Sequence, residues 1–188
     1  MCACAPHTPV EDRISIDLVF HVIDDVTTHE RFLSEQISEL NRVLADSVFR
    51  VASSDIVVHV DPAWRNYGGD NTRECEKIAE VSNEVDVFVV ESIKPPEVIV
   101  GKCECDIITK IYRRYLVIID DEAKPGTTHP TTLGHEIGHL YGLTHNFSDE
   151  KNIMKSGDRN LDSSFSAGQL TSMAKHARRF SLARLFGS

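Results

Sequence analysis

Residues 135–145 read His-Glu-Ile-Gly-His-Leu-Tyr-Gly-Leu-Thr-His and hold three imidazoles, a carboxylate and a glycine at the spacing of an open metal site. On a helix, His135 and His139 would lie on one face, one turn above the other. Gly142 can adopt positive φ and end that helix sharply, so that His145 arrives from outside it. Three neutral imidazoles around one zinc ion leave a fourth position for water, which is the arrangement of a catalytic zinc site.

Glu136 supplies the second part of the chemistry. It follows the first histidine of the motif and projects roughly 100° around a helix from it, beside the ion rather than onto it. A general base at that position can take a proton from a metal-bound water as the water attacks a carbonyl carbon, and can then pass the proton to the leaving group. The motif therefore predicts hydrolysis.

The complete His-Glu-x-x-His-x-x-Gly-x-x-His pattern is followed by Asn152-Ile153-Met154 after a polar turn. On these residues the chain resembles the metzincin clan of zinc peptidases over about residues 129–180. The resemblance implies a zinc metalloendopeptidase that acts on peptides or proteins, with Zn²⁺ as its cofactor. The roles it implies are zinc ligands at His135, His139 and His145, a general base at Glu136, and the Met-turn residue, an apolar floor beneath the metal, at Met154.

Two further segments are similar to the pappalysin-type subgroup of the clan. One is Gly-Leu-Thr-His-Asn-Phe at 142–147, where a phenylalanine closely follows the third histidine, and the other is residues 163–169, which lead into a terminal helix. The sequence is thus closest to that subgroup.

The elements that must position the site can be read from hydrophobic periodicity. Residues 14–23 alternate and then become continuously apolar, which predicts a strand. Thr27 and Glu30 have the spacing of a capping box, and apolar residues at helical spacing follow it. That predicted helical stripe consists of Leu33, Ile37, Leu40, Leu44 and Val48.

The remaining elements are predicted in the same way. We expect strands at 56–60, 85–90 and 115–119, an irregular edge strand within 98–108, the active-site helix at about 131–141, and a last helix capped by Ser166 and Gln169. Residues 85–90 are almost all apolar, which favours a central position in the sheet. We expect residues 61–74 to form a loop with Trp64 and Tyr67 as packing residues.

This order of elements predicts an α+β, metzincin-like zincin fold. It has a mixed, mostly parallel twisted sheet, an active-site helix, and a small irregular C-terminal lobe closed by a helix. We expect a single catalytic domain over residues 1–188, with an upper lobe at about 10–142 and a lower lobe at about 143–188. The edge strand near 101–109 would offer backbone groups to an extended peptide substrate.

Composition narrows the classes of partner. The chain has 188 residues, a formal net charge of −9 and 41% hydrophobic residues, as in an ordinary globule. An acidic chain without a basic stripe does not favour a nucleic-acid partner, and the longest apolar runs are too short to span a bilayer. No signal peptide is expected in this chain, and secretion is favoured only through the resemblance. We expect a monomer.

Two alternatives share the metal ligands. One is a zinc-binding protein without peptidase activity, and the other is a protease toxin that cuts a single protein. The presence of Glu136 favours an enzyme over the first, whereas only the substrate separates the second.

The other candidate residues favour less specific interpretations. We expect His21, His59 and His176 to be structural, His7 and His29 to lie on the surface, and His129 to be a loop residue.

The five cysteines leave at least one thiol unpaired, and a link from Cys75 to Cys103 or Cys105 stays open. A cysteine switch through Cys2 or Cys4 lacks its usual sequence context. Asp158, Asp162 and backbone carbonyls are candidates for contacting the metal ligands, and the two aspartates are also candidates for selecting a basic substrate residue. Asp120, Asp121 and Glu122 favour a solvated turn over a calcium site.

Overall fold

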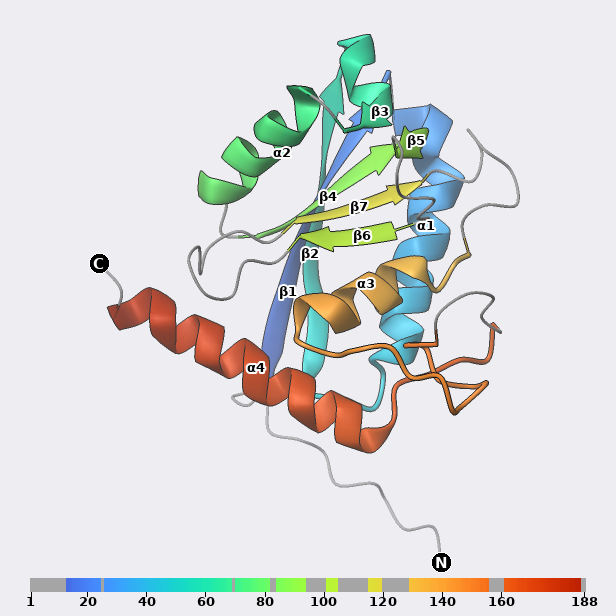
Figure 1. Ribbon diagram of the computed structural model, residues 1–188, viewed down its shortest axis with the longest axis vertical. Coiled ribbons are helices and arrows are strands. Elements are labelled where there is room, and N and C mark those ends of the chain that lie inside the picture. The colour runs from blue at the N-terminus through green and yellow to red at the C-terminus, as the bar shows by residue number, and fades with distance from the viewer. Residues whose placement is uncertain are drawn as a thin grey trace, which may run out of the picture.

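The computed structural model describes residues 13–24, 26–68, 70–81, 84–93, 101–104, 115–119, 129–155 and 161–186 (Figure 1). The helices are α1 (Val26–Val43), α2 (Asp70–Val81), α3 (Thr132–Leu140) and α4 (Ala167–Phe186), with a 3₁₀ turn η2 (Pro62–Arg65). The strands are β1 (Ile14–Ile23), β2 (Phe49–His59), β3 (Asn66–Tyr67), β4 (Val85–Val90), β5 (Ser92–Ile93), β6 (Gly101–Glu104) and β7 (Tyr115–Ile119).

A five-stranded sheet has the order β2-β1-β4-β7-β6, and the short strands β3 and β5 pair separately. Strands β2, β1, β4 and β7 run parallel to one another, whereas β6 is antiparallel to β7. The predicted mixed, mostly parallel sheet is therefore confirmed, and β4 is its central strand with all six residues buried. In this sheet β2 and β6 are the two edge strands.

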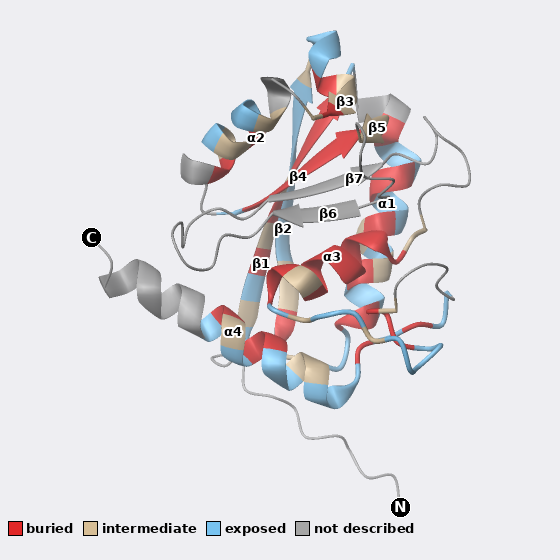
Figure 2. Cartoon of the chain, viewed as in Figure 1, coloured by how far each residue is buried: buried red, intermediate tan, exposed pale blue. Residues whose placement is uncertain are grey.

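The main core lies between one face of the sheet and helices α1, α3 and α4. Strand side chains alternate between the two faces, so Phe20 and Val22 of β1 and Val87 and Val89 of β4 point into this core. From the other side the core receives Leu33 and Leu40 of α1, Leu133 and Ile137 of α3, and Met173 and Ala177 of α4. Figure 2 shows that α3, which carries the metal-site motif, is almost entirely buried.

A second core lies on the opposite face of the sheet. Phe88 and Val90 of β4 pack there with Trp64, Tyr67 and Cys75. Trp64 and Tyr67 thus pack as expected, although residues 70–74 belong to α2 rather than to a loop. Burial raises the pKa of the Cys75 thiol to about 12, and this thiol is free rather than linked. A free, protonated thiol in that position is a packing residue.

Helix α1 ends earlier than the apolar stripe predicted. The helix stops at Val43, and Leu44 and Val48 pack against the core from the turn that follows. The Ser47 hydroxyl stabilises that turn because it donates to the Leu44 carbonyl at 2.7 Å and accepts from the Phe49 amide at 3.1 Å. The apolar spacing continues through the turn. It therefore predicted correctly that Leu44 and Val48 pack against the core, and it predicted the end of the helix wrongly.

Two other expectations were wrong in detail. Strand β2 begins at Phe49 rather than Ile56, because its polar first half pairs with β1 although it carries no apolar run. His29 is buried rather than on the surface, and its Nε2 lies 2.9 Å from the Ile23 carbonyl.

Among the described residues, no helix is both long enough and apolar enough to pass through a lipid bilayer.

Candidate metal centre

The start of α3 is fixed by a side chain from another helix. Gln36 of α1 is buried, accepts from the Leu133 amide at 2.9 Å and donates to the His129 carbonyl at 3.1 Å. His129 Nδ1 lies 2.8 Å from the Thr131 hydroxyl, just before the helix begins. Since the first amides of a helix have no partner within the helix, Gln36 supplies one and ties α3 to α1.

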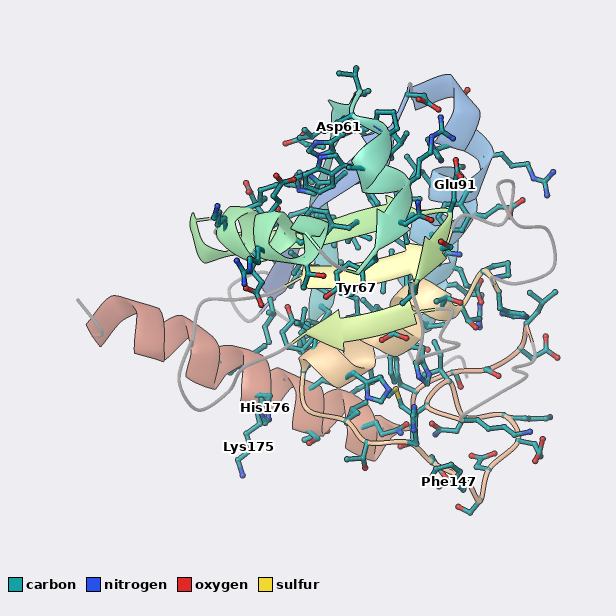
Figure 3. The ribbon with its side chains drawn as sticks, turned by 45° about the horizontal axis from the view of Figure 1, so that its top comes forward. Asp61, Tyr67, Glu91, Phe147, Lys175 and His176 are labelled. Atoms are coloured by element: carbon teal, nitrogen blue, oxygen red, sulfur yellow. The ribbon has the colours of Figure 1, made fainter. Side chains whose placement is uncertain are left out.

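The end of α3 is fixed by Gly142, whose φ is +84°. The Gly142 amide donates to the His139 carbonyl at 2.9 Å, and the Leu143 amide donates to the Gly138 carbonyl at 2.9 Å. This pair of bonds is the Schellman ending of a helix. A Cβ on Gly142 would lie 2.7 Å from the ring of His176 on α4 (Figure 3), so the position is closed to a side chain both by conformation and by packing.

The three histidines of the motif converge. His139 Nε2 lies 3.1 Å from His135 Nε2 and 3.1 Å from His145 Nε2. The three could hold one metal ion, because their ligand atoms all lie within 4.8 Å of one another. Two nitrogens about 2.0–2.1 Å from one tetrahedral zinc ion would be about 3.3 Å apart. The observed spacing therefore fits a single zinc ion.

The hydrogen bonds of two of these rings decide which nitrogen carries the proton. His135 Nδ1 lies 2.7 Å from the Ile153 carbonyl, and His139 Nδ1 lies 2.8 Å from the Leu143 carbonyl. A carbonyl oxygen can only accept, so each Nδ1 must be the N–H donor, and in a neutral ring Nε2 is then unprotonated. Two unprotonated nitrogens that face each other at 3.1 Å repel unless a cation lies between them.

Glu136 lies on the same helix, one position after His135, and is 5% exposed. His135 is buried beside it, whereas His139 is half-buried and His145 is exposed. The site therefore has a closed inner side formed by α3 and an open side next to His145. Phe147, which is also exposed, stands on this open side, with its ring centroid 5.8 Å from that of His145 (Figure 3).

Met154 lies directly beneath α3 and is fully buried. A Cβ on Gly138 would overlap the Met154 sulfur and would lie 3.0 Å from the Phe165 ring. Gly138 is therefore what allows the Met154 turn to approach the helix so closely. The sequence pattern specified neither this glycine nor the contact it permits.

The turn that carries Met154 is held by two amide side chains. Asn152 accepts from the Met154 amide at 2.9 Å through Oδ1, and its side chain pairs with that of Gln169 by two hydrogen bonds of 2.9 and 3.0 Å. Gln169 also accepts from the Ser166 amide at 2.9 Å, and Ser166 Oγ accepts from the Gln169 amide at 3.3 Å. The predicted capping box of α4 is thus confirmed, and the same glutamine anchors the turn.

Each predicted site residue can now be located. The structure brings His135, His139, His145, Glu136 and Met154 together around α3. His21 and His59 contact each other beside Phe88 and Trp64, whereas His176 of α4 lies next to Gly142 at the end of α3. Asp162 is on an exposed turn, and the pKa of Arg42 is raised by its hydrogen bond to Glu39, with a smaller contribution from the charge of Asp162. Asp158, Asp120, Asp121, Glu122, His7, Cys2, Cys4 and Cys105 lie outside the described residues, as do the side-chain positions of Cys103.

The roles of Gln36, Gly138 and Asn152 were not predicted from the sequence. These residues position the site but do not form it. Gln36 lies 93 residues from the carbonyl to which it donates, so only the fold reveals its role. The Ile153 and Leu143 carbonyls were predicted only in general terms, as backbone carbonyls that contact the metal ligands, and not by residue.

No protein-family model matches the sequence, and no curated protein matches it. Solved structures do share its fold. Metalloproteinase-II from Bacteroides fragilis superposes with a TM-score of 0.61 at 15% identity, over 86% of this chain and 53% of that one. Archaemetzincin from Methanopyrus kandleri superposes with a TM-score of 0.56 at 14% identity, over 92% of this chain and 100% of that one. The chain spans about half the length of the Bacteroides protein, and at these identities the likeness shows the fold alone.

Proposed function

We propose that this chain is a zinc-dependent endopeptidase that hydrolyses peptide bonds in peptide or protein substrates. His135, His139 and His145 bind the zinc ion, and Glu136 is the general base. The observation that carries the proposal is the set of Nε2 atoms that converge at 3.1 Å while the Nδ1 atoms of two rings donate to carbonyls. The two solved structures of the same fold, a metalloproteinase and an archaemetzincin, support the same class of activity.

The donor set fits zinc. Neutral imidazoles suit Zn²⁺, and three of them with an open side are the ligand set of a catalytic rather than a structural site. When bound, zinc would supply a Lewis acid that acidifies a water molecule and polarises a carbonyl. The chain itself orients the rings, because the Ile153 and Leu143 carbonyls hold His135 and His139 with Nε2 toward the common point.

Glu136 carries the proton in the proposed reaction. Its carboxylate accepts a proton from the attacking water and later donates that proton to the nitrogen of the leaving amine. Because Glu136 is 5% exposed, bulk water has little access to the carboxylate. Its helix is fixed at both ends, by Gln36 and by Gly142, so the carboxylate keeps a constant position relative to the histidines.

Met154 serves as the floor of the proposed site. Its side chain is fully buried under Gly138, one residue before His139. An apolar, polarisable thioether at that position fills space beneath the rings without competing for a cation with the imidazoles. We assign it as the Met-turn residue on that basis, and the pappalysin-type subgroup stays a prediction from residues 142–147 and 163–169.

The proposed substrate site follows β6, the edge strand nearest α3. Among the described residues β6 pairs only with β7, so its other edge can add an extended peptide as a further strand. It lies against α3 (Figure 1), which would bring a bound peptide past Glu136 and the histidines. We propose that the chain acts as one catalytic domain, with residues up to about 142 above the substrate and residues from about 143 below it.

A substitution of Glu136 by Gln tests the assignment of the base. We expect Glu136→Gln to bind zinc like the unaltered protein, because the three imidazoles are unchanged. Its kcat should fall by about 10²–10⁴-fold, the usual contribution of general acid–base catalysis. Zinc content by elemental analysis and cleavage of a quenched fluorescent peptide are measured on the same samples. Glu74→Gln, an exposed position on α2, is the matched control and should keep full activity. Full turnover by Glu136→Gln would overturn the assignment.

Digestion of a peptide library, followed by mass spectrometry with and without a zinc chelator, tests the reaction class itself. We expect cuts at internal bonds that disappear with the chelator and return with added zinc. No cleavage of any member would favour a zinc-binding protein or a protease restricted to one protein.

A further inference from the structure

The edge of the sheet opposite β6 exposes an apolar segment. Of the large hydrophobic side chains that are exposed in the described part of the chain, four fall in one short run. They are Ile56 at 40%, Val57 at 41%, Val58 at 40% and Val60 at 83% exposure. Figure 2 shows the same strand, β2, exposed over most of its length. Such a contiguous apolar edge is a surface on which another strand can dock.

Within the part of the chain that the structure describes, the backbone of this segment has one unpaired side. There β2 is the outermost strand of the sheet and pairs only with β1. The His59 carbonyl accepts from the Asp24 amide at 3.1 Å, so the backbone groups of His59 point toward β1. Since these directions alternate along a strand, the N–H and C=O groups of Ser54, Ile56 and Val58 point outward.

We propose that β2 pairs with β2 of a second copy of this chain in antiparallel orientation, so that the sheets of the two copies become one. Antiparallel pairing of identical strands is symmetric about a two-fold axis, which is the geometry of most homodimers. We expected a monomer from the sequence, and this exposed edge is the reason to propose a dimer instead. The proposal does not depend on the proposed peptidase activity.

The outward positions restrict the register. Only residues of the same parity can face each other, because outward backbone groups must meet outward groups. In the permitted registers closest to the middle of the apolar run, Asp55 would face Asp55, Val57, His59 or Asp61 of the second copy. Like charges directly opposite each other destabilise a sheet, whereas opposite or hydrogen-bonding pairs stabilise it. Like charges therefore exclude Asp55 opposite Asp55 or Asp61, and Asp55 opposite Val57 would set a carboxylate against an apolar side chain. The favoured register has Asp55 opposite His59, because it sets the apolar residues 56–58 against one another.

That register has further consequences for the side chains. Ile56 faces Val58 of the second copy and exchanges backbone hydrogen bonds with it, and Val57 faces Val57 at a non-hydrogen-bonded position. Apolar side chains thus meet apolar ones on both faces of the joined sheet.

The first test measures the mass of the purified full chain in solution by light scattering over a range of concentrations. We expect twice the chain mass of 21.0 kDa for the unaltered protein and 21.0 kDa for Val57→Lys, which would place two ammonium groups against each other on the dyad. Leu161→Lys, at an exposed apolar residue on another surface, is the matched control and should remain a dimer. Circular dichroism checks that both variants are folded.

A second test reads the register directly. At the Val57 pair the Cα atoms would be about 4.5 Å apart, which a disulfide can bridge. In a background where the four cysteines other than Cys75 are Ser, Val57→Cys should form a disulfide-linked dimer under mild oxidation. Val60→Cys should not, although Val60 is more exposed at 83%, because in this register it faces Ser54.

Each outcome decides something. A dimer that is lost in Val57→Lys and trapped by Val57→Cys supports the proposal. A protein that is monomeric at every concentration overturns the proposal, because β2 then does not pair with a second copy. A dimer that survives Val57→Lys and shows no crosslink at position 57 overturns strand pairing, because the contact must then lie elsewhere. Crosslinking at position 60 but not 57 contradicts the register.

Discussion

At the scale of single residues, the site depends on which nitrogen of each ring is protonated. The spacing of His135, His139 and His145 was enough to predict that they converge, because helix geometry alone puts the first two on one face. Their partners could not be predicted in the same way. The Ile153 carbonyl that fixes His135 comes from a turn 18 residues away, and backbone groups have no signature in a sequence.

Gly142 shows the same division between what the pattern predicts and what the fold adds. Its positive φ was predicted from the motif, and the structure has φ at +84°. The contact with His176 of α4 was not predicted, because α4 carries that histidine 34 residues later and nothing in the sequence links the two.

We therefore expect Gly142→Ala to weaken both stability and metal binding. A left-handed conformation costs an alanine about 1–2 kcal/mol, and the new Cβ would collide with His176. Moving this turn also moves the Leu143 carbonyl that orients His139. Urea denaturation of the metal-free protein and zinc titration measure the two effects. Thr144→Ala, an exposed position in the same loop, is the control and should change neither. Unchanged zinc affinity in Gly142→Ala would show that the turn does not orient His139.

At the scale of elements, two pairs of side chains hold the parts of the site together. Gln36 joins α1 to the start of α3, and the amides of Asn152 and Gln169 join the Met154 turn to α4. Strands β1 and β4 had the bounds that their apolar patterns predicted. Helix α2 and the first half of β2 were missed, because a mostly polar segment that buries only a few residues has no strong periodicity.

Replacing Gln36 by Met should destabilise the fold through α3. The substitution keeps the length of the side chain but leaves the Leu133 amide and the His129 carbonyl without this partner. Each buried group left unsatisfied costs about 1–3 kcal/mol. Chemical denaturation measures the loss, and Ser38→Met, an exposed position on the same helix, should lose far less. Equal stability of the two variants would mean that Gln36 does not cap α3.

At the scale of the whole molecule, the sheet separates two cores with different chemistry. The face toward α1 and α3 is apolar, whereas the other face carries a chain of polar side chains across three strands. His59 of β2 contacts His21 of β1 at 3.0 Å, and His21 contacts Asp86 of β4 at 2.9 Å. Trp64 stacks on His59 with ring centroids 3.9 Å apart. Sequence alone predicted structural histidines here, but not that they form one network.

This network predicts how stability depends on pH. Burial, with a smaller contribution from His21, holds the pKa of His59 below its usual 6.5. The unfolded chain therefore binds a proton at His59 more readily than the folded chain does. The contribution of His59 to the free energy of unfolding is fully present above pH 6.5. It is lost as the pH falls from 6.5 toward the lower pKa that His59 has in the folded protein.

Urea denaturation at several pH values tests the effect. His59→Gln removes the titrating group and keeps an amide that can contact His21, so its stability should fall less than that of the unaltered protein between pH 7 and 5.5. Parallel curves for the two proteins would show that the titration of His59 is not linked to folding.

The proposed metal centre is tested most directly by counting the zinc ions that the chelator-stripped full chain takes up, with isothermal titration and elemental analysis. We predict one tightly bound zinc ion per chain, and its loss in His139→Ala, because His139 Nε2 lies 3.1 Å from both other ligand nitrogens. His59→Gln should bind zinc normally. A chain that takes up no zinc, or that binds it equally well without His139, would show that the three histidines do not form a zinc site.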